Sequence, residues 1–223
     1  YWYENYSGTG VFPPKSSGLI EQELLEERWE NLIKTINNIG TITKRNINIE
    51  DREREFYFGG ENLIQIEIGR FKYKTLMNAW LNHLTLSANS DFNSKTLIIT
   101  RSNINSNKNN FKITKELLPI KKKEARITYK SLKEFAHLGR ENCWPIPPES
   151  GLAYALSTKE SVEKMHKKFD KTWEGDFHIT GEKESLAMKL CFGRNCKSTD
   201  FFNDKTFHDI LMSLYAPILE KLN

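Results

Sequence analysis

The first third of the chain changes from a helical to a strand-like spacing of apolar residues. Between Leu19 and Asn37 apolar positions recur every three or four residues, which predicts an amphipathic helix with one core-facing stripe. Gly40 then supplies a helix stop signal. The stripe consists of Leu19, Ile20, Leu24, Leu25, Trp29, Leu32, Ile33 and Ile36.

From Thr41 to Lys74 apolar and polar residues alternate. Because successive side chains of a strand point to opposite faces, this period of two predicts strands with one buried face. The stretch from Phe56 to Lys74 is expected to form a hairpin that turns at the GGEN sequence, residues 59–62. The predicted buried positions are Ile47, Ile49, Phe56, Phe58, Ile64, Ile66 and Ile68.

The remaining two thirds of the chain predict helices around a second pair of strands. Residues 74–89 are apolar enough for a helix buried in a core, and residues 95–115 predict a strand, an Asn- and Ser-rich loop and a returning strand. From about residue 115 the spacing is helical, and Pro217 is expected to kink or break the last helix. This order predicts an α/β fold with a mixed sheet flanked by helices.

Composition indicates a globular protein. Hydrophobic residues make up 38% of the 223 positions, which suffices for a packed core, and no stretch approaches the ~18 apolar residues of a membrane span. Cys143, Cys191 and Cys196 lack metal-site spacing, which favours reduced thiols, a cytoplasmic location and no cofactor. The aromatic opening, residues 1–14, begins without methionine, so we expect irregular structure there and a fragment of a longer chain.

The hairpin lacks the signature of a metal-dependent nuclease. Nucleases of the PD-(D/E)xK class need an acid on one strand and, on the next, an acid followed two residues later by lysine. No Asp or Glu of this chain has Lys at the second following position. Glu67 comes nearest, with Gly69 in the place of the lysine and Lys72 further on. No catalytic residue is therefore predicted.

Two basic segments are the candidate DNA contacts. With 33 basic and 29 acidic residues, the net charge of +4 permits contact with nucleic acid but does not require it. One segment interleaves cations with aromatic rings, as in single-strand binding sites, and the other is a hairpin without acids. A strand end with core-facing rings and a solvated hairpin are the structural alternatives. The candidate residues are Arg70, Phe71, Lys72, Tyr73 and Lys74 in the first, and Arg101, Lys108 and Lys112 in the second.

Five longer stretches, in this order, resemble one known family. They are SGTGVFPPKSSGLIEQELLEE (7–27), MNAWLNHLTLSA (77–88), PIPPESGLAYAL (145–156), KKFDKTWEGDFHITGEKES (167–185) and LYAPILEKL (214–222). Together they resemble the C-terminal region of the RecC family, the gamma subunits of exodeoxyribonuclease V in bacterial RecBCD helicase and nuclease complexes. The resemblance extends over essentially the whole chain.

The resemblance implies one nuclease-like domain over residues 1–223, with a restriction-endonuclease-like fold that is catalytically degenerate. It implies a heterotrimer with RecB-like and RecD-like subunits, whose helicase and nuclease activities lie outside this domain, and DNA at a duplex-to-single-strand junction. It also implies a pin that separates the strands, on one of the two predicted hairpins. The expected function is a non-catalytic DNA-handling and assembly module in double-strand break repair and recombination.

Two other functions stay open. An active nuclease with an altered metal site would use Glu67, Glu55 or Glu61 with a displaced Lys72. A purely protein-docking domain would expose apolar rings, for which the sequences YWYENY (1–6) and DFFNDKTF (200–207) are candidates.

Overall fold

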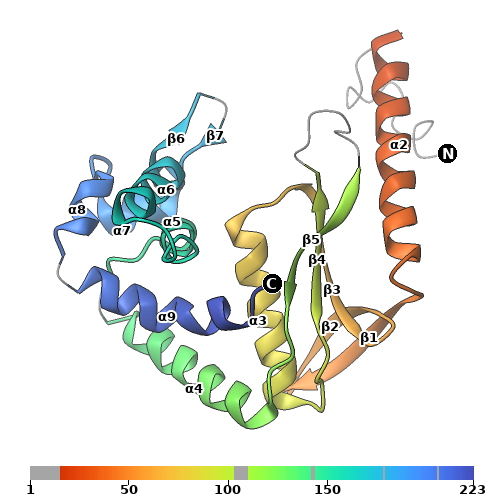
Figure 1. The fold of residues 1–223 in the computed structure, drawn as a ribbon, viewed down its shortest axis with the longest axis horizontal. Coiled ribbons are helices and arrows are strands. Elements are labelled where there is room, and N and C mark those ends of the chain that lie inside the picture. The colour runs from red at the N-terminus through yellow and green to blue at the C-terminus, as the bar shows by residue number, and fades with distance from the viewer. Residues whose placement is uncertain (1–15, 103–109, 142–143, 178, 205) are drawn as a thin grey trace. The chain divides into compact units, whose positions relative to one another are not determined.

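The computed structural model describes residues 16–102, 110–141, 144–177, 179–204 and 206–223, and the chain forms two compact units (Figure 1). Unit 1 comprises Tyr1–Phe71 and Lys95–Glu116, and unit 2 comprises Lys72–Ser94 and Leu117–Asn223. The chain therefore leaves unit 1 after Phe71 and returns to it at Lys95. The predictions for the opening segment and for the tip of the second hairpin lie outside the described residues.

Among the described residues, unit 1 is a five-stranded mixed sheet with one helix beside it, which confirms the predicted α/β class. The strands lie in the order β1-β2-β3-β4-β5. The elements are α2 (Ser16–Asn37), β1 (Ile42–Ile49), β2 (Arg52–Gly59), β3 (Asn62–Arg70), β4 (Thr96–Arg101) and β5 (Phe111–Leu117).

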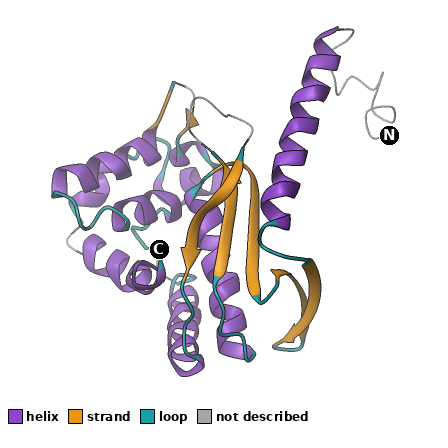
Figure 2. Cartoon of the chain, turned by 45° about the vertical axis from the view of Figure 1, so that its right-hand side comes forward, coloured by secondary structure: helices purple, strands orange, loops and turns teal. Residues whose placement is uncertain are grey.

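Strands β1 and β2 form a long ribbon, which we call the β1–β2 ribbon (residues 42–59). They pair antiparallel at all eight positions of each strand, whereas β2 pairs with β3 only at Phe58–Leu63 and Gly59–Asn62. The ribbon therefore bends away from the other strands of unit 1 (Figure 2). Its two-residue turn, Glu50 and Asp51, has φ angles of 50° and 61°, typical of a tight hairpin turn.

The core of unit 1 lies between α2 and the sheet. Leu32, Ile64, Ile99 and Phe111 form a buried cluster, and Ile36, Ile39 and Ile42 pack against it. The hydroxyl of Thr35 donates a hydrogen bond to the carbonyl oxygen of Phe111 at 3.1 Å, which ties the helix to β5.

The predicted core-facing stripe of α2 is correct in part, since Leu32 belongs to the core cluster and Ile36 packs against it. Leu19, Ile20 and Ile33 are exposed, and Trp29 is 61% exposed. The N-terminal part of the helix reaches beyond the strands in both views, so the sheet does not cover it (Figures 1 and 2). The same correction applies to β3, where Ile66 and Ile68 are exposed, although the predicted burial of Ile49, Phe56, Phe58 and Ile64 is confirmed.

The predicted first hairpin is too long at its C-terminal end. Strand β3 ends at Arg70, and helix α3 (Tyr73–Asn89) begins after the extended residue Lys72. The N–H of Thr75 already donates to the carbonyl oxygen of Lys72 at 3.1 Å. Alternating cations and rings continue the strand-like pattern to Lys74, but the helix starts there because its apolar face follows immediately.

Unit 2 is mainly helical, as predicted from residue 115 onward. Its elements are α3, α4 (Lys122–Leu138), α5 (Pro148–Ala155), α6 (Val162–Glu174), β6 (Gly175–Asp176), β7 (Ile179–Thr180), the 3-10 helix η1 (Glu182–Glu184), α7 (Leu186–Phe192), α8 (Ser198–Phe202) and α9 (Phe207–Lys221). The sequence pattern missed β6, β7 and α8, which are short. Within the described residues, a search for helices with the length and apolarity of a membrane span found none.

Helix α9 continues through Pro217, so of the predicted kink or break the break is wrong, and the kink stays a prediction. Proline removes one backbone donor from the helix. Burial of Leu211, Tyr215 and Ile218 on the same helix compensates for that loss.

Aromatic rings fill the core between α5, α6, α8 and α9. Phe169 lies 5.3 Å from Phe201 and 5.6 Å from Phe207 between ring centroids. The rings of Phe201 and Phe207 are buried, so the prediction that DFFNDKTF exposes a docking surface is wrong at these two positions.

Glu182 caps the start of α5 from a distant part of the chain. Its carboxylate accepts hydrogen bonds from the N–H of Glu149 at 2.8 Å and from the N–H and hydroxyl of Ser150 at 2.7 and 2.6 Å. These donors include backbone N–H groups that a helix start leaves unsatisfied. Burial nevertheless raises the pKa of Glu182, and the hydrogen bonds only partly offset that effect.

Candidate nucleic-acid interface

Two arginines from different predicted segments meet at one edge of the sheet. Arg70 ends β3 and Arg101 ends β4, and the two are register partners in the parallel pair. Because neighbouring parallel strands end on the same side of a sheet, both arginines lie at the carboxyl ends of these strands, which we call this edge of the sheet. Arg70 is exposed and Arg101 is half-buried. The structure thus brings together one residue of each basic segment, Arg70 and Arg101.

A bulge before Arg70 sets this register. The β3–β4 pairing shifts between Glu67 and Arg70. A carboxylate oxygen of Glu67 accepts a hydrogen bond from the N–H of Gly69 at 3.1 Å, so the acid is bonded within its own strand. A Cβ at position 69 would lie 3.1 Å from that oxygen, so a larger residue would crowd this contact.

The other predicted contacts are distributed over both units. Phe71 is half-buried, and Lys112 is exposed on β5. Lys72 and Lys74 are exposed at the start of α3 in unit 2, where burial raises the pKa of the half-buried Tyr73. The predicted contact Lys108 lies outside the described residues.

The β1–β2 ribbon adds three cations that the sequence pattern did not select, Arg45, Arg52 and Arg54. All three are exposed. The R-x-R spacing at 52–54 was the available signal, because residues two apart in a strand share a face. The mixed charges of the sequence DREREF concealed it.

The acids proposed for an altered nuclease site are not gathered by the structure. Glu55 forms an ion pair with Lys44 at 2.5 Å on the ribbon, and Glu67 bonds to Gly69. In the part of the chain that the structure describes, no three His, Cys, Asp or Glu side chains are close enough together to hold a metal ion.

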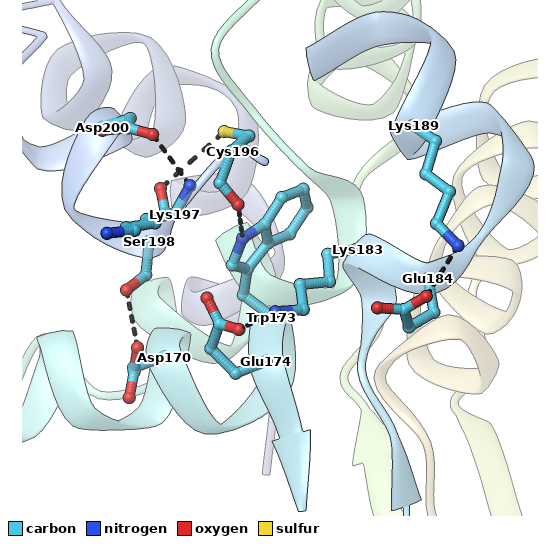
Figure 3. A network of polar contacts seen from close by, with 10 residues as sticks. All are labelled: Asp170, Trp173, Glu174, Lys183, Glu184, Lys189, Cys196, Lys197, Ser198 and Asp200. Atoms are coloured by element: carbon cyan, nitrogen blue, oxygen red, sulfur yellow. Dashed lines mark hydrogen bonds and ion pairs between the residues drawn. The ribbon is translucent and has the colours of Figure 1, made fainter. Parts of the chain in front are cut away.

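Polar side chains around α6 and α8 bond to one another (Figure 3). The hydroxyl of Ser198 donates to Asp170 at 2.6 Å, and the indole N–H of Trp173 donates to the carbonyl oxygen of Cys196 at 3.2 Å. Lys183 pairs with Glu174 in the same region. Burial, followed by the charge of Asp200, raises the pKa of the Cys196 thiol, which disfavours the reactive thiolate. This network therefore has a structural role.

Two of the described histidines, His83 and His166, pack against aromatic rings. His83 is completely buried in α3, as predicted for a core residue, with its ring 6.1 Å from that of Trp80 and 5.5 Å from that of Phe92. His166 stacks on Phe202 with a centroid distance of 3.9 Å.

A comparison with protein-family models supports the resemblance. Residues 1–159 match the family described as the RecC C-terminal domain. A comparison with curated proteins found no match. The family match covers more than half of the 223 residues and includes both strands that end in the paired arginines. The chain therefore belongs to the RecC C-terminal domain family, and RecC is a subunit of the RecBCD-type exodeoxyribonuclease V of DNA repair.

Proposed function

We propose that this chain is a non-catalytic DNA-handling and assembly module of a RecBCD-type helicase and nuclease. In this role it works in the cytoplasm with RecB-like and RecD-like subunits, helps to split duplex DNA and guides the single strands in double-strand break repair and recombination. Family membership supports the complex and its process.

The pairing of Arg70 with Arg101 carries the DNA-handling part of the proposal. Arginines at the carboxyl ends of two neighbouring strands supply two positive charges on one side of the sheet, and arginine binds phosphate oxygens through pairs of N–H donors. Phosphate contacts position a nucleic acid without reading its sequence. This property suits a module that handles every strand that the motors deliver.

The proposal includes the nuclease-like fold. The elements before β5 are a helix, an antiparallel meander, a second helix and a parallel strand. The β2–β3 hairpin contains Glu67 at the place where the nuclease class has its acids. We propose that this fold is restriction-endonuclease-like and catalytically degenerate, with the strand-separating pin on one of the two predicted hairpins. We further propose that both units work as one domain, because the family match crosses from unit 1 into unit 2.

Replacing the paired arginines should weaken DNA binding without unfolding the chain. We expect the double variant Arg70→Gln, Arg101→Gln to bind a forked duplex with a lower salt dependence. Each lost phosphate contact lowers the log–log slope by about 0.7 on single strands, so the slope should fall by about 1.4. Fluorescence titration of the 223-residue chain at several salt concentrations measures the slope.

The matched control, Arg140→Gln with Lys159→Gln, removes two exposed cations of unit 2. It should leave the slope unchanged. Equal slopes for the arginine pair, the control and the wild type would refute the assignment of this edge. Cleavage of the fork with Mg²⁺ by the wild type, lost in Glu67→Ala, would support the active-nuclease alternative.

We also propose that the exposed apolar face of α2 docks a partner subunit of the complex. Trp29 and Ile33 lie one helical turn apart and are both exposed, and Ile66 and Ile68 of β3 are exposed in the same unit. A tryptophan left in solvent is typical of the central residues of protein interfaces.

Replacing Trp29 with Glu should therefore impair assembly. We expect at least about a 30-fold loss of affinity for the RecB-like or RecD-like subunit, since truncation of a central interface residue costs about 2 kcal/mol or more. Glu23→Gln, at an exposed position of the same helix, is the control and should assemble normally. Titration of the partner subunits with each chain measures the affinity, and wild-type affinity of Trp29→Glu would contradict the docking role.

A further inference from the structure

The β1–β2 ribbon separates its charges between two faces. Cross-strand partners in an antiparallel pair share a face, and so do residues two apart in one strand. Arg45 is paired with Phe56, Ile47 with Arg54 and Ile49 with Arg52. One face therefore carries all three arginines of the ribbon together with apolar residues, and we call it the arginine face.

The opposite face of the ribbon contains the acids. Lys44 is paired with Tyr57, Asn46 with Glu55 and Asn48 with Glu53. Lys44 and Glu55 neutralise each other at 2.5 Å. The hydrogen bond to Glu55 raises the pKa of Lys44, so this lysine stays charged within the pair. The opposite face thus has a net negative charge. The arginine face carries Arg45, Arg52 and Arg54 and no acid of β1 or β2.

The three arginines of this face are available to an anion, whereas its apolar residues Ile49, Phe56 and Phe58 are buried. Arg45, Arg52 and Arg54 are exposed, and none forms an ion pair with another described residue. The guanidinium carbon of Arg45 lies 4.4 Å from the centre of the Phe58 ring, and its Nη2 donates to the carbonyl oxygen of Gly60 at 3.4 Å. These contacts orient Arg45, so less side-chain freedom is lost when it binds.

The geometry points to the sugar–phosphate backbone of a single nucleic acid strand as the ligand of the arginine face. Arg52 and Arg54 are two residues apart on β2, which places their Cα atoms about 6.6 Å apart. This distance is similar to the spacing between neighbouring phosphates of an extended strand. Guanidinium groups bind phosphates through paired donors, and the contact carries no base sequence information.

This inference rests on the proposed DNA-handling function and adds a second contact surface to it. The contacts at Arg70 and Arg101 lie at the carboxyl ends of β3 and β4, whereas the arginine face belongs to β1 and β2. A strand that contacts both surfaces would be held at two places within unit 1. The two surfaces can be tested separately because they share no residue.

The test compares two variants of the 223-residue chain that differ in net charge. Arg52→Gln with Arg54→Gln removes two positive charges from the arginine face. Adding Glu53→Gln and Glu55→Gln restores the wild-type net charge by changing only the opposite face. Both are titrated with a labelled oligo-dT strand and with a duplex at several salt concentrations, and thermal unfolding checks that each variant is folded.

We expect the double variant to bind the single strand about tenfold more weakly, with a log–log salt slope lower by about 1.4. The quadruple variant should stay as weak as the double variant, because the face and not the net charge determines binding. Wild-type affinity in the double variant, or full recovery in the quadruple variant, overturns the inference. An equal loss on single strands and duplex also overturns the choice of a single strand.

Two further results distinguish this inference from the proposed function and from the binding of an acidic protein segment. Loss of binding in the Arg70 and Arg101 variant, with normal binding in the arginine-face variant, rejects the arginine face and retains the proposed function. If DNA binding is unchanged but binding of a poly-glutamate peptide is lost in the arginine-face variant, the ligand is an acidic protein segment and the inference is wrong.

Discussion

Replacing Gly181 with Ala is expected to destabilise unit 2 by about 3 kcal/mol or more. A Cβ at this position would lie 2.3 Å from the carbonyl carbon of Glu174 and 2.3 Å from the carbonyl oxygen of Trp173. Both are backbone atoms at the end of α6, so no side-chain rotation relieves the overlap. Gly175 is equally confined, since its Cβ would lie 2.3 Å from the carbonyl oxygen of Ile179.

Gly193→Ala is the control for Gly181→Ala within the same unit. Gly193 has φ +84°, but no atom lies within 4 Å of its added Cβ. With ψ 159° its backbone lies in a region essentially restricted to glycine, so its replacement should cost only the conformational penalty of about 1–3 kcal/mol. Urea unfolding followed by tryptophan fluorescence gives the free energy of unfolding for both variants. An equal loss of unfolding free energy in both variants would show that the close approach of Gly181 to the backbone of Trp173 and Glu174 does not explain the need for glycine at position 181.

His83 should make the chain sensitive to mild acid. Its side chain is completely buried, and this burial lowers its pKa from 6.5 to about 4 despite a hydrogen bond with the backbone of Leu118. Between these two pH values the unfolded chain binds a proton that the folded chain does not. The free energy of unfolding should therefore fall as the pH decreases from 6.5 to 4, by about 3 kcal/mol in total.

The variant His83→Gln tests the acid sensitivity directly. It removes the titrating group, so its stability should depend less on pH than that of the wild type over this range. His137→Gln, at an exposed position in the last turn of α4, should retain the wild-type pH dependence. Denaturant titrations at pH 7, 5.5 and 4 provide the comparison. A wild-type pH profile for His83→Gln would assign the sensitivity to other groups, with Glu182 acting in the opposite direction because its pKa is raised.

Local periodicity was sufficient to predict most helices and strands, because each repeats its apolar spacing over at least two turns or four residues. It failed at Lys72, where the alternation of Arg70 to Lys74 is strand-like but the backbone bonds are already helical. It also failed at Trp29, because the spacing identifies an apolar stripe and cannot show how far the covering sheet extends.

The candidate interface depended on information that the sequence does not contain locally. Arg70 and Arg101 were both predicted as contacts, but their meeting requires parallel pairing of β3 with β4 across 31 residues of chain. The arginine face required the register of β1 against β2. The sequence alone did not predict this register. Without it, the net charge of the segment is zero, because the two arginines are balanced by two acids at Arg52, Glu53, Arg54 and Glu55.

The excursion of the chain between β3 and β4 has a consequence for the order of folding during synthesis. The pairing of β1 with β2 is local, so the β1–β2 ribbon can form as soon as residues 42–59 are free, on the microsecond timescale of a hairpin. Strand β4 pairs with β3 only after residues 72–94, which belong to unit 2, have been made. Until then the edge of β3 has no neighbour, so a nascent chain of which only the residues up to this interval have left the ribosome exposes an aggregation-prone strand. A ribosomal pause that leaves β3 outside the ribosome and β4 still inside it should therefore reduce the yield of folded protein more than a pause after residue 116 has emerged.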